Sequence, residues 1–198
     1  MRQINLREYK NQLRSEIKEY RGSLPCEQKA QMDEAVFSNI LRMREYKSSG
    51  TIFVYVSTDI EVDTRQIIIH ALQNGKKVAV PRCIDGTREM LFHYITSFDD
   101  LESGTFGVEE PKETCEIAVG SPSDLMLVPA LIIDYDGFRI GYGKGYYDRY
   151  IAQFTGRLAG LCYNDNFKRQ IHRGRFDIPV NVIVTDTGIR TVRRKDFK

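Results

Sequence analysis

The 198-residue sequence has no apolar run close to the roughly 20 residues that a membrane-spanning helix needs. Its first segment, MRQINLREYKNQLR, is charged and has no apolar stretch, so we expect no signal peptide. The four cysteines lie far apart without a C-x-x-C pair, and the three histidines are scattered. These absences argue against a membrane protein, a disulfide scaffold and a Cys/His zinc site, and they favour a cytoplasmic protein.

A strong charge of one sign is also missing. Lys and Arg total 29 against 27 Asp and Glu, a net charge of +2, so there is no global basic field of the kind nucleic-acid binding requires. The basic C-terminal segment RTVRRKDFK is typical of a solubilising tail rather than a nucleic-acid arm. The length suits one ordinary domain with a real core. We expect a single monomeric domain over 1–198, with small-molecule rather than nucleic-acid or membrane partners.

Periodicity predicts that helices and strands alternate along the chain. Apolar residues at helical spacing predict a first helix over about 3–21, ended by Gly22, and a second over about 25–46. Short β-branched runs predict strands at 51–56, 76–82, 90–95, 124–134, 157–163 and 181–186, with 90–95 as an edge or antiparallel strand. Helices are predicted at 64–73 and 146–154, and 97–123 is predicted to be irregular. This order predicts an α/β layer fold with a mostly parallel sheet.

The most distinctive segment is FRIGYGKGYYDRY, 138–150, between a predicted strand and a predicted helix. Its three glycines would let backbone N–H groups approach an anion, and the helix N-terminus would add partial positive charge. Lys144 and Arg139 add full charges suited to phosphate. The spacing is neither the Rossmann G-x-G-x-x-G nor the G-x-x-x-x-G-K-[ST] of a P-loop. A phosphate cradle and a purely structural turn both remain open.

Basic residues on the predicted first helix form a second candidate feature. Lys10 and Arg14 are one turn apart and therefore share a face. Further basic residues fall near the same stripe, namely Arg7, Lys18 and Arg21. Such a stripe is ordinarily a solvated face, and the residues alone do not favour a ligand.

Carboxylates and tyrosines near the predicted strand ends are equally ambiguous by themselves. Asp148 would lie in the first turn of its helix, where it suits either the helix dipole or a magnesium ion carried by a nucleotide. Glu61 follows the strand at 51–56, where α/β sites form, but it could be an ordinary loop carboxylate. The tyrosines beside the glycines could stack on a flat ligand or simply pack against the core.

Several segments together resemble the 5-formyltetrahydrofolate cyclo-ligase family. VPALIIDYDGFRIGYGKGYYDRY, 128–150, is similar to its signature. Further family-like segments follow in the family's order: YKNQLR near the N-terminus, EVDTRQII at 61–68, AVPR at 79–82, GTFGVEEP at 104–111 and FDIPVNVIVTD at 176–186. The chain departs from the pattern at Ala130, Phe176 and Asn181, where the family has Gly, His and Asp. Roles for Phe176 and Asn181 are thereby in doubt, but not a role for Asp177.

The resemblance implies a three-layer α/β/α fold with a sugar-isomerase/CoA-transferase-like, Rossmann-type layout. It also implies ATP- and Mg²⁺-dependent cyclisation of 5-formyltetrahydrofolate, or its polyglutamates, to 5,10-methenyltetrahydrofolate, a C–N bond-forming ligase reaction. Arg139 and Lys144 would be catalytic, stabilising the transferring phosphoryl group, and Asp148 and Asp177 would hold the magnesium ion.

The implied ligand contacts fall into two sets. The ATP contacts would be Lys10, Arg14, Arg139, Gly141, Gly143, Lys144, Gly145, Tyr146 and Tyr147. The folate contacts would be Val56, Glu61, Tyr142, Gly143, Lys144, Gly145 and Tyr146. Alternatives are a sugar-phosphate isomerase that uses the glycine segment for a substrate phosphate, and a non-enzymatic nucleotide- or RNA-binding module.

Overall fold

The computed structural model describes residues 5–104 and 107–193 of the chain. Thr105 and Phe106 of the GTFGVEEP segment therefore lie outside the described residues, as do residues 1–4 and the last five residues of the basic C-terminal segment. Within the described ranges, no helix is long and apolar enough to cross a membrane.

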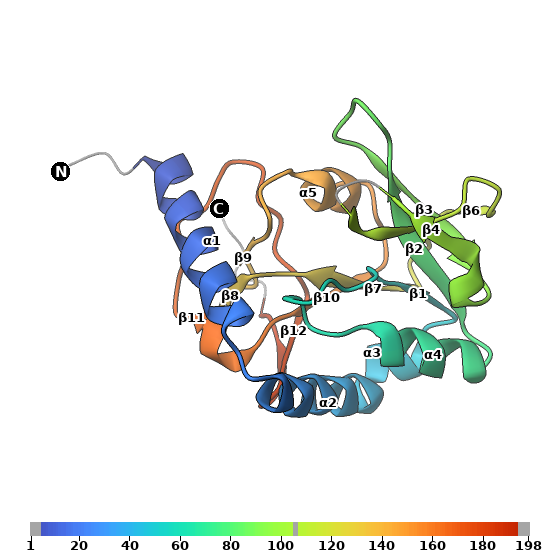
Figure 1. Ribbon diagram of the computed structural model, residues 1–198, viewed down its shortest axis with the longest axis horizontal. Coiled ribbons are helices and arrows are strands. Elements are labelled where there is room, and N and C mark those ends of the chain that lie inside the picture. The colour runs from blue at the N-terminus through green and yellow to red at the C-terminus, as the bar shows by residue number, and fades with distance from the viewer. Residues whose placement is uncertain (1–4, 105–106, 194–198) are drawn as a thin grey trace.

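The middle layer of the described fold is an eight-stranded sheet in the order β13-β12-β10-β7-β1-β2-β3-β6 (Figure 1). Its strands are β1 (Thr51–Phe53), β2 (Lys77–Cys83), β3 (Met90–Ile95), β6 (Ile117–Ala118), β7 (Leu125–Pro129), β10 (Arg157–Leu161), β12 (Val182–Thr185) and β13 (Gly188–Thr191). The run from β12 through β10, β7 and β1 to β2 is parallel, whereas β13, β3 and β6 pair antiparallel. The predicted mostly parallel sheet and the antiparallel strand at 90–95 are confirmed.

Helices lie on both faces of this sheet (Figure 1). One face carries α2 (Cys26–Arg42), α3 (Arg44–Ser48) and α4 (Arg65–Gln73), and the other carries α5 (Tyr146–Ile151). The helix α1 (Leu6–Gly22) packs instead on a small second sheet of β11 (Phe167–Lys168), β8 (Ile132–Asp134) and β9 (Arg139–Ile140). The predicted three-layer α/β/α fold is confirmed.

Short elements complete the described chain. The segment 97–123, predicted to be irregular, contains the antiparallel pair β4 (Leu101–Ser103) and β5 (Glu109–Pro111) as well as β6. Single 3-10 turns lie at Phe98–Asp100 and Asn164–Asn166. The pair β4–β5 packs beside β2 and thereby borders the end of the sheet where β2 leads into a loop.

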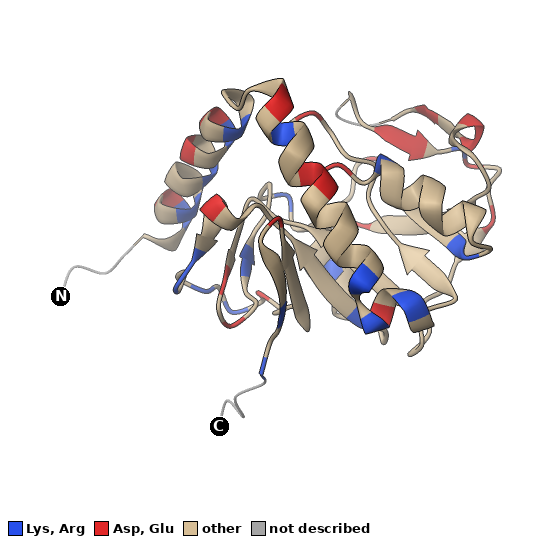
Figure 2. Cartoon of the chain, turned by 90° about the horizontal axis from the view of Figure 1, so that it is seen from below, with Lys and Arg blue, Asp and Glu red and all other residues tan. Residues whose placement is uncertain are grey.

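Alternation along the strands divides the core into two halves. Ile52 of β1 faces the α2–α4 layer with Ile40 and Ile67, whereas its neighbour Phe53 faces α5 with Tyr150. This is the period of two that a strand buried on both faces requires. Figure 2 shows Lys, Arg, Asp and Glu mixed along the helices, without a field of one sign. Because the sheet is buried on both faces, the ends of its strands have fixed positions. The site lies at those ends.

The predicted second helix is wrong at its C-terminal end. It breaks at Met43, whose φ of −61° and ψ of 134° are extended, and α3 then restarts at Arg44. Met43 is only 2% exposed and packs in the core with Tyr46, so burial of both side chains overrides the continuous helical pattern. The first helix is capped by the Asn5 side chain, which accepts hydrogen bonds from the backbone N–H groups of Arg7 and Glu8.

Three other predicted elements are longer than the observed ones. The run 124–134 is two strands in two sheets, because β7 ends at Pro129 and β8 begins at Ile132. Only Thr51–Phe53 of the run 51–56 lies in the sheet, although the residues after it remain buried. The helix predicted to extend to Phe154 ends at Ile151. For the two strand runs, the apolar pattern reports burial correctly but does not report where backbone pairing stops.

The core contact between α4 and the sheet can be tested on opposite faces of this one helix. Ile67 is fully buried in the α2–α4 half of the core, whereas Ile69 is 42% exposed. We expect Ile67→Ala to lower the free energy of unfolding by about 2–5 kcal/mol, because it leaves a cavity. Ile69→Ala should change it by less than about 1 kcal/mol. Urea unfolding measures both, and equal losses would contradict the assigned orientation of α4.

Candidate functional site

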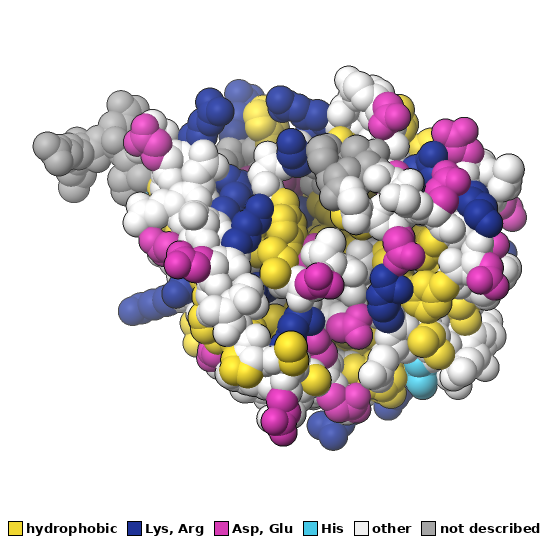
Figure 3. All heavy atoms as spheres, in the orientation of Figure 1, with side chains coloured by type: hydrophobic (Ala, Val, Ile, Leu, Met, Phe, Trp, Pro, Cys, Tyr) yellow, Lys and Arg dark blue, Asp and Glu magenta, His cyan; other side chains and the backbone are white. Residues whose placement is uncertain are grey.

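One cavity of about 640 Å³ lies where β1, β2 and β7 lead into loops, between α1 and the glycine segment. Ligand sites of parallel α/β folds form at this edge of the sheet. The residues predicted to bind ligands all line it: Lys10, Arg14, Val56, Glu61, Arg139, Gly141, Tyr142, Gly143, Lys144, Gly145, Tyr146, Tyr147, Asp148 and Asp177. Figure 3 shows the hollow on one face, with Lys and Arg side chains near its α1 side and hydrophobic ones deeper inside.

The glycine segment runs from β9 into α5 and is held against α1. The Arg14 Nε donates to the Gly141 carbonyl oxygen at 2.8 Å. Gly143 has a φ of +93°, and a Cβ there would lie 2.9 Å from the Arg14 guanidinium carbon. Gly145, at the start of α5, is also left-handed. The glycines therefore serve two purposes here, because they permit the turn and let an arginine approach the backbone closely.

Arg139 is the most buried cation at this end of the cavity. Its side chain is 4% exposed, and its guanidinium donates to Asp148 Oδ1 and to the Ile178 carbonyl oxygen, both at 2.8 Å. Burial lowers its pKa, and the carboxylates of Asp148 and Asp177 act in the opposite direction. β9 holds the backbone of Arg139 opposite Ile133 of β8, so the guanidinium is aimed by a paired strand.

A second ion pair joins α1 to a distant part of the chain. Lys10 Nζ donates to Asp177 Oδ2, which also accepts from the Gly174 backbone N–H at 2.7 Å. Each predicted magnesium ligand thus contacts a predicted phosphate-binding cation. Among the described residues no three Asp, Glu, His or Cys side chains cluster as a complete metal site. Two carboxylates without a third suit a Mg²⁺ ion that takes its remaining ligands from phosphates and water.

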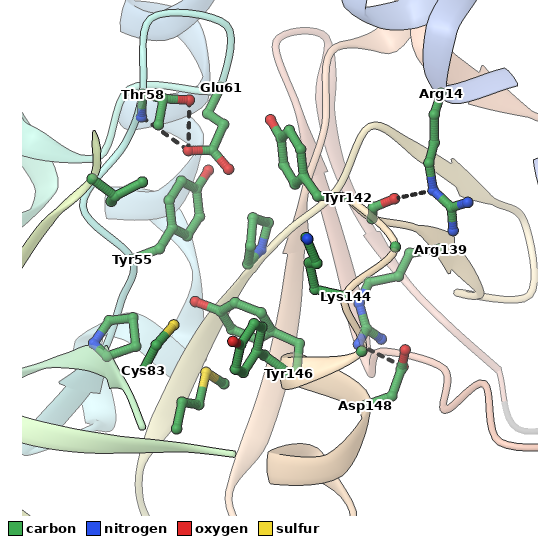
Figure 4. A pocket seen from close by; sticks show the side chains of 18 of the residues that line it. Arg14, Tyr55, Thr58, Glu61, Cys83, Arg139, Tyr142, Lys144, Tyr146 and Asp148 are labelled. Carbon is green, nitrogen blue, oxygen red and sulfur yellow. Dashed lines mark hydrogen bonds and ion pairs between the residues drawn. The ribbon is translucent and has the colours of Figure 1, made fainter. Parts of the chain in front are cut away.

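Glu61 marks the other end of the cavity, close to the end of β1. The side chain is buried at 8% exposure, and its Oε2 accepts from the backbone N–H and the hydroxyl of Thr58, at 2.9 and 3.0 Å. Burial raises the pKa of the carboxyl group, and the Thr58 hydrogen bonds lower it. Figure 4 shows Tyr55 and Tyr142 beside Glu61, on the side opposite Asp148 and Arg139. The cavity therefore has an end rich in cations and an end built around one carboxylate.

Two tyrosine hydroxyls in this cavity have unused hydrogen-bonding capacity. The hydroxyl of Tyr147 is buried and has no hydrogen-bond partner among the described residues, and the buried hydroxyl of Tyr142 interacts with Glu61 and Thr58 without a hydrogen bond of regular geometry. Burial raises the pKa of both, so both are neutral donors at physiological pH. By contrast, the Tyr55 hydroxyl donates to the Val62 carbonyl oxygen at 3.0 Å. Unpartnered buried hydroxyls are uncommon in folded proteins and call for an explanation.

Sequence reasoning missed several residues that line the cavity. Lys18, assigned to a solvated face, borders it with its Nζ 5.1 Å from the centre of the Tyr142 ring. The others are Tyr55, Thr58, Pro81, Cys83, Met90, Val108, Glu109, Glu110 and Pro129. The position of Pro81, Cys83 and Pro129 at the ends of β2 and β7 was an available signal. Burial raises the pKa of Cys83 to about 11, so its thiol is protonated.

Other residues that the sequence singled out lie elsewhere. Arg82 forms ion pairs with Glu102 and Glu113 and donates to the Pro111 carbonyl oxygen, so it fastens β5 to β2. The Phe176 side chain is 79% exposed, whereas Asn181 accepts a hydrogen bond from the Leu158 backbone. Among the scattered histidines and cysteines, His172 is exposed and packs edge-on against Tyr9, and Cys162 is buried in the core.

Arg21 is where the expectation of a solvated basic face is plainly wrong. Its side chain is 2% exposed, in the last turn of α1, and it donates hydrogen bonds to several segments of the fold. Arg7, by contrast, is exposed as expected. One face of a helix can therefore carry a buried arginine and an exposed arginine, and their spacing in the sequence does not tell them apart.

Comparison with known proteins identifies what this chain resembles. A model of the 5-formyltetrahydrofolate cyclo-ligase family matches residues 6–186. A probable 5-formyltetrahydrofolate cyclo-ligase of Caenorhabditis elegans is 34% identical over 153 residues, 74% of each chain. A 5-formyltetrahydrofolate cyclo-ligase of Haemophilus influenzae is 26% identical over 176 residues, 86% of this chain and 94% of its own.

A solved structure has the same fold over nearly its whole length. The 5,10-methenyltetrahydrofolate synthetase of Aquifex aeolicus superimposes with a TM-score of 0.82 at 30% identity, covering 96% of this chain and 95% of its own. The synthetase of Mycoplasma pneumoniae shares the fold with a TM-score of 0.71 at 23% identity. Because the family model spans almost the entire chain, and the fold and the cavity agree with it, the protein belongs to the 5-formyltetrahydrofolate cyclo-ligase family.

Proposed function

We propose that the protein cyclises 5-formyltetrahydrofolate to 5,10-methenyltetrahydrofolate, using ATP and Mg²⁺ and releasing ADP and phosphate. One observation carries the proposal: a single cavity joins an end rich in cations, suited to phosphates, to an end built on a buried carboxylate, suited to N–H donors. The reaction requires both ligands side by side, because a phosphoryl group must pass from one to the other.

The chemistry accounts for the cations at one end. The formyl oxygen of an amide-like group leaves poorly, so the γ-phosphoryl group of ATP is transferred to it and ADP is released. The N10 amine then attacks the formyl carbon and loses its proton, the carbon–oxygen bond breaks, and phosphate departs as the ring closes. Arg139 and Lys144 stabilise the charge that is shared between donor and acceptor oxygens during the transfer.

The nucleotide would lie along the surface formed by α1 and the glycine segment. Lys10 and Arg14 contact the phosphates from α1, and the backbone N–H groups at the start of α5 approach from the opposite side. Gly143 supports this assignment, because the absence of a Cβ brings Arg14 close to the turn. Tyr146 lines the same cavity and offers a flat face to either ligand.

Asp148 and Asp177 would hold the Mg²⁺ ion that accompanies ATP. A bound Mg²⁺ neutralises phosphate charge and orients the β- and γ-phosphates. Both carboxylates are already within reach of the cations expected to contact those phosphates. The chain itself holds two carboxylates and two cations close together. When the nucleotide binds, the carboxylates would contact Mg²⁺ and the cations would contact the phosphates.

Glu61 would bind the pterin ring. An ionised carboxylate accepts two parallel N–H bonds from a 2-amino-pyrimidine edge, and such charged pairs are stronger than neutral ones. The Thr58 hydrogen bonds to Oε2 fix the carboxylate, and Val56 supplies an apolar contact at the end of β1. Tyr142 and Tyr147 would donate their unused hydroxyls to ligand atoms that the free protein does not contain.

The direct test is turnover by the purified protein. We expect methenyl absorbance to grow only when 5-formyltetrahydrofolate, ATP and Mg²⁺ are all present, and a chelator should abolish it. Lys144→Ala should lower kcat by about 10²- to 10³-fold, since it removes a charge from the transfer step. Lys168→Ala, an exposed lysine on β11, is the matched control and should leave kcat unchanged. Absence of turnover at saturating substrates would reject the function.

The pterin assignment is tested at Glu61. Glu61→Gln keeps the side-chain shape but removes the charge, so we expect the KM for 5-formyltetrahydrofolate to rise by about 10- to 100-fold. The KM for ATP should stay within about twofold of the original value, because Glu61 lies at the opposite end of the cavity. Asp59→Asn, an exposed carboxylate in the same loop, is the control. An unchanged folate KM in Glu61→Gln would rule out this contact.

The unused hydroxyl of Tyr147 gives a test that separates binding from stability. Tyr147→Phe should not lower the melting temperature, because that hydroxyl has no hydrogen-bond partner among the described residues. It should lower kcat/KM by about tenfold, the value of one lost hydrogen bond to a ligand. Tyr46→Phe is the control, since its hydroxyl is 2.9 Å from His70 Nδ1 and lies away from the cavity. That variant should lose about 1 kcal/mol of stability and no activity. A lower melting temperature with an unchanged kcat/KM in Tyr147→Phe would contradict the role of Tyr147.

A further inference from the structure

Arg21 joins three segments of the fold through one buried guanidinium. Its Nη1 donates to the Ile60 carbonyl oxygen at 3.2 Å, in the loop that carries Glu61. Its Nη2 donates to the Ala130 and Leu131 carbonyl oxygens, at 2.9 and 3.1 Å, where the chain passes from β7 to β8. Its Nε donates to Asn166 Oδ1 at 3.0 Å. The planar five-donor guanidinium is suited to hold diverging carbonyl groups in this way, and a lysine ammonium is not.

The backbone of Glu61 is fixed on both sides. Arg21 holds the carbonyl group that precedes it, and the Tyr163 hydroxyl donates to the carbonyl oxygen of Glu61 itself at 3.2 Å. Tyr163 lies beneath the guanidinium, whose carbon is 4.9 Å from the ring centre, and its one hydroxyl proton is shared between the Glu61 carbonyl oxygen and Asp33 Oδ1, which is closer at 2.6 Å. A stacked arginine and tyrosine therefore hold the two peptide groups that set the direction of the Glu61 side chain.

The charge of Arg21 has no ordinary counter-ion. Among the described residues, no carboxylate lies within ion-pair distance of its guanidinium, although the side chain is 2% exposed. A buried charge without a partner is costly, so an opposite charge nearby contributes strongly. The guanidinium bonds the carbonyl group next to Glu61, and its charge adds to the Thr58 hydrogen bonds in lowering the pKa of the Glu61 carboxyl group, whereas burial raises that pKa.

We propose that Arg21 is a positioning residue for Glu61: its guanidinium fixes the backbone that aims this carboxylate and places a buried positive charge beside the loop that carries it. It does not touch the ligand itself. The kinetic part of this inference rests on the proposed function, because it uses 5-formyltetrahydrofolate as the ligand of Glu61. The structural part concerns the ligand-free protein and stands independently of any reaction.

The charged and titratable groups that face Glu61 determine how it responds to pH. They are Arg21 from α1, Tyr55 from the end of β1, Tyr142 from the glycine segment and Tyr147 from α5. Burial raises the pKa of each tyrosine above its usual value, so none of the three ionises between about pH 5 and pH 8. Within that range, Arg21 is therefore the one group of these four that carries a charge, and its substitution changes that charge without altering the Thr58 hydrogen bonds.

The sign of the pH effect follows from this arrangement. The ionised form of Glu61 accepts N–H donors, so the folate KM should rise as pH falls and Glu61 takes up a proton. Removing the positive charge at residue 21 takes away one of the contributions that oppose burial, and so raises the Glu61 pKa. The rise in folate KM should then begin at a higher pH in Arg21→Met than in the original protein. Arg21→Lys keeps the charge, so its pH profile should stay near the original one.

The experiment compares Arg21→Met and Arg21→Lys by kinetics at several pH values. For Arg21→Met we expect the folate KM at neutral pH to rise about tenfold or more, with the ATP KM within about twofold. Arg21→Lys should show a smaller rise in folate KM without the pH displacement. Two controls are Arg42→Met, an exposed arginine of α2, and Asn39→Ala, which removes a buried hydrogen bond to the Thr185 carbonyl oxygen. Asn39→Ala should lose stability without changing either KM.

An NMR titration of isotope-labelled glutamate in the ligand-free protein tests the electrostatic part without any reaction. The Glu61 carboxyl group should titrate at a higher pH in Arg21→Met than in the original protein, and near the original pH in Arg21→Lys. If Arg21→Met does not fold, Tyr163→Phe replaces it. That variant removes the hydrogen bond to the Glu61 carbonyl but no charge, so the folate KM should rise while the titration of Glu61 stays in place.

Several outcomes would overturn the inference. Equal increases in the folate and ATP KM values, or a Glu61 titration that does not move in Arg21→Met, would reduce Arg21 to a structural residue. An unchanged folate KM in both Arg21→Lys and Tyr163→Phe would have the same meaning. If the original protein shows no turnover at all, the proposed function fails, and the NMR titration still decides whether Arg21 controls Glu61.

Discussion

Two ion pairs, Arg139 with Asp148 and Lys10 with Asp177, hold together the end of the cavity where phosphates are expected. One pair joins β9 to α5 within a short segment, and the other joins α1 to the segment before β12, which is far away in the sequence. The Arg139 guanidinium is almost fully buried, and such a charge is tolerated only with a carboxylate and further hydrogen bonds. The remaining features of the site are arranged around this balance of charge.

The balance has a consequence for ligand binding under the proposed function. In the free protein, each predicted magnesium ligand contacts a predicted phosphate-binding cation. A nucleotide that arrives with Mg²⁺ brings both kinds of charge, so the carboxylates can turn to the metal while the cations turn to the phosphates. The net charge buried at this end then changes little when the nucleotide binds. The carboxylates and cations are also already in place when phosphoryl transfer begins.

The sequence predicted this end of the cavity because most of its residues are contiguous. Arg139 to Asp148 lie within one short segment, and a strand followed by glycines and a helix fixes their relative positions locally. Lys10 and Asp177 could be added only through the family resemblance. By spacing and charge alone, Lys10 is no different from Arg7, which is exposed, or from Arg21, which is buried.

What could not be predicted depends on contacts between distant segments. The run 124–134 is apolar between its two terminal aspartates, and apart from Pro129 nothing in it indicates that the chain leaves the main sheet there. The break occurs where Arg21, more than 100 positions earlier in the chain, binds the carbonyl oxygens of Ala130 and Leu131. Local propensity favours a continuous strand there, but a tertiary hydrogen bond takes the acceptors that a strand would use.

Arg21 and Arg139 together explain why the two ends of the cavity differ. Arg139 meets its carboxylate directly, at 2.8 Å, so the charge at that end is neutralised by contact and can be redistributed when phosphates bind. Arg21 uses its donors on carbonyl groups and an amide, and it holds the Glu61 loop through the Ile60 carbonyl oxygen rather than by pairing with the carboxylate. Glu61 Oε2 accepts from Thr58, and Oε1 accepts no hydrogen bond from Arg21. The same residue type thus prepares one end of the cavity for anions and leaves a carboxylate free at the other to receive N–H donors.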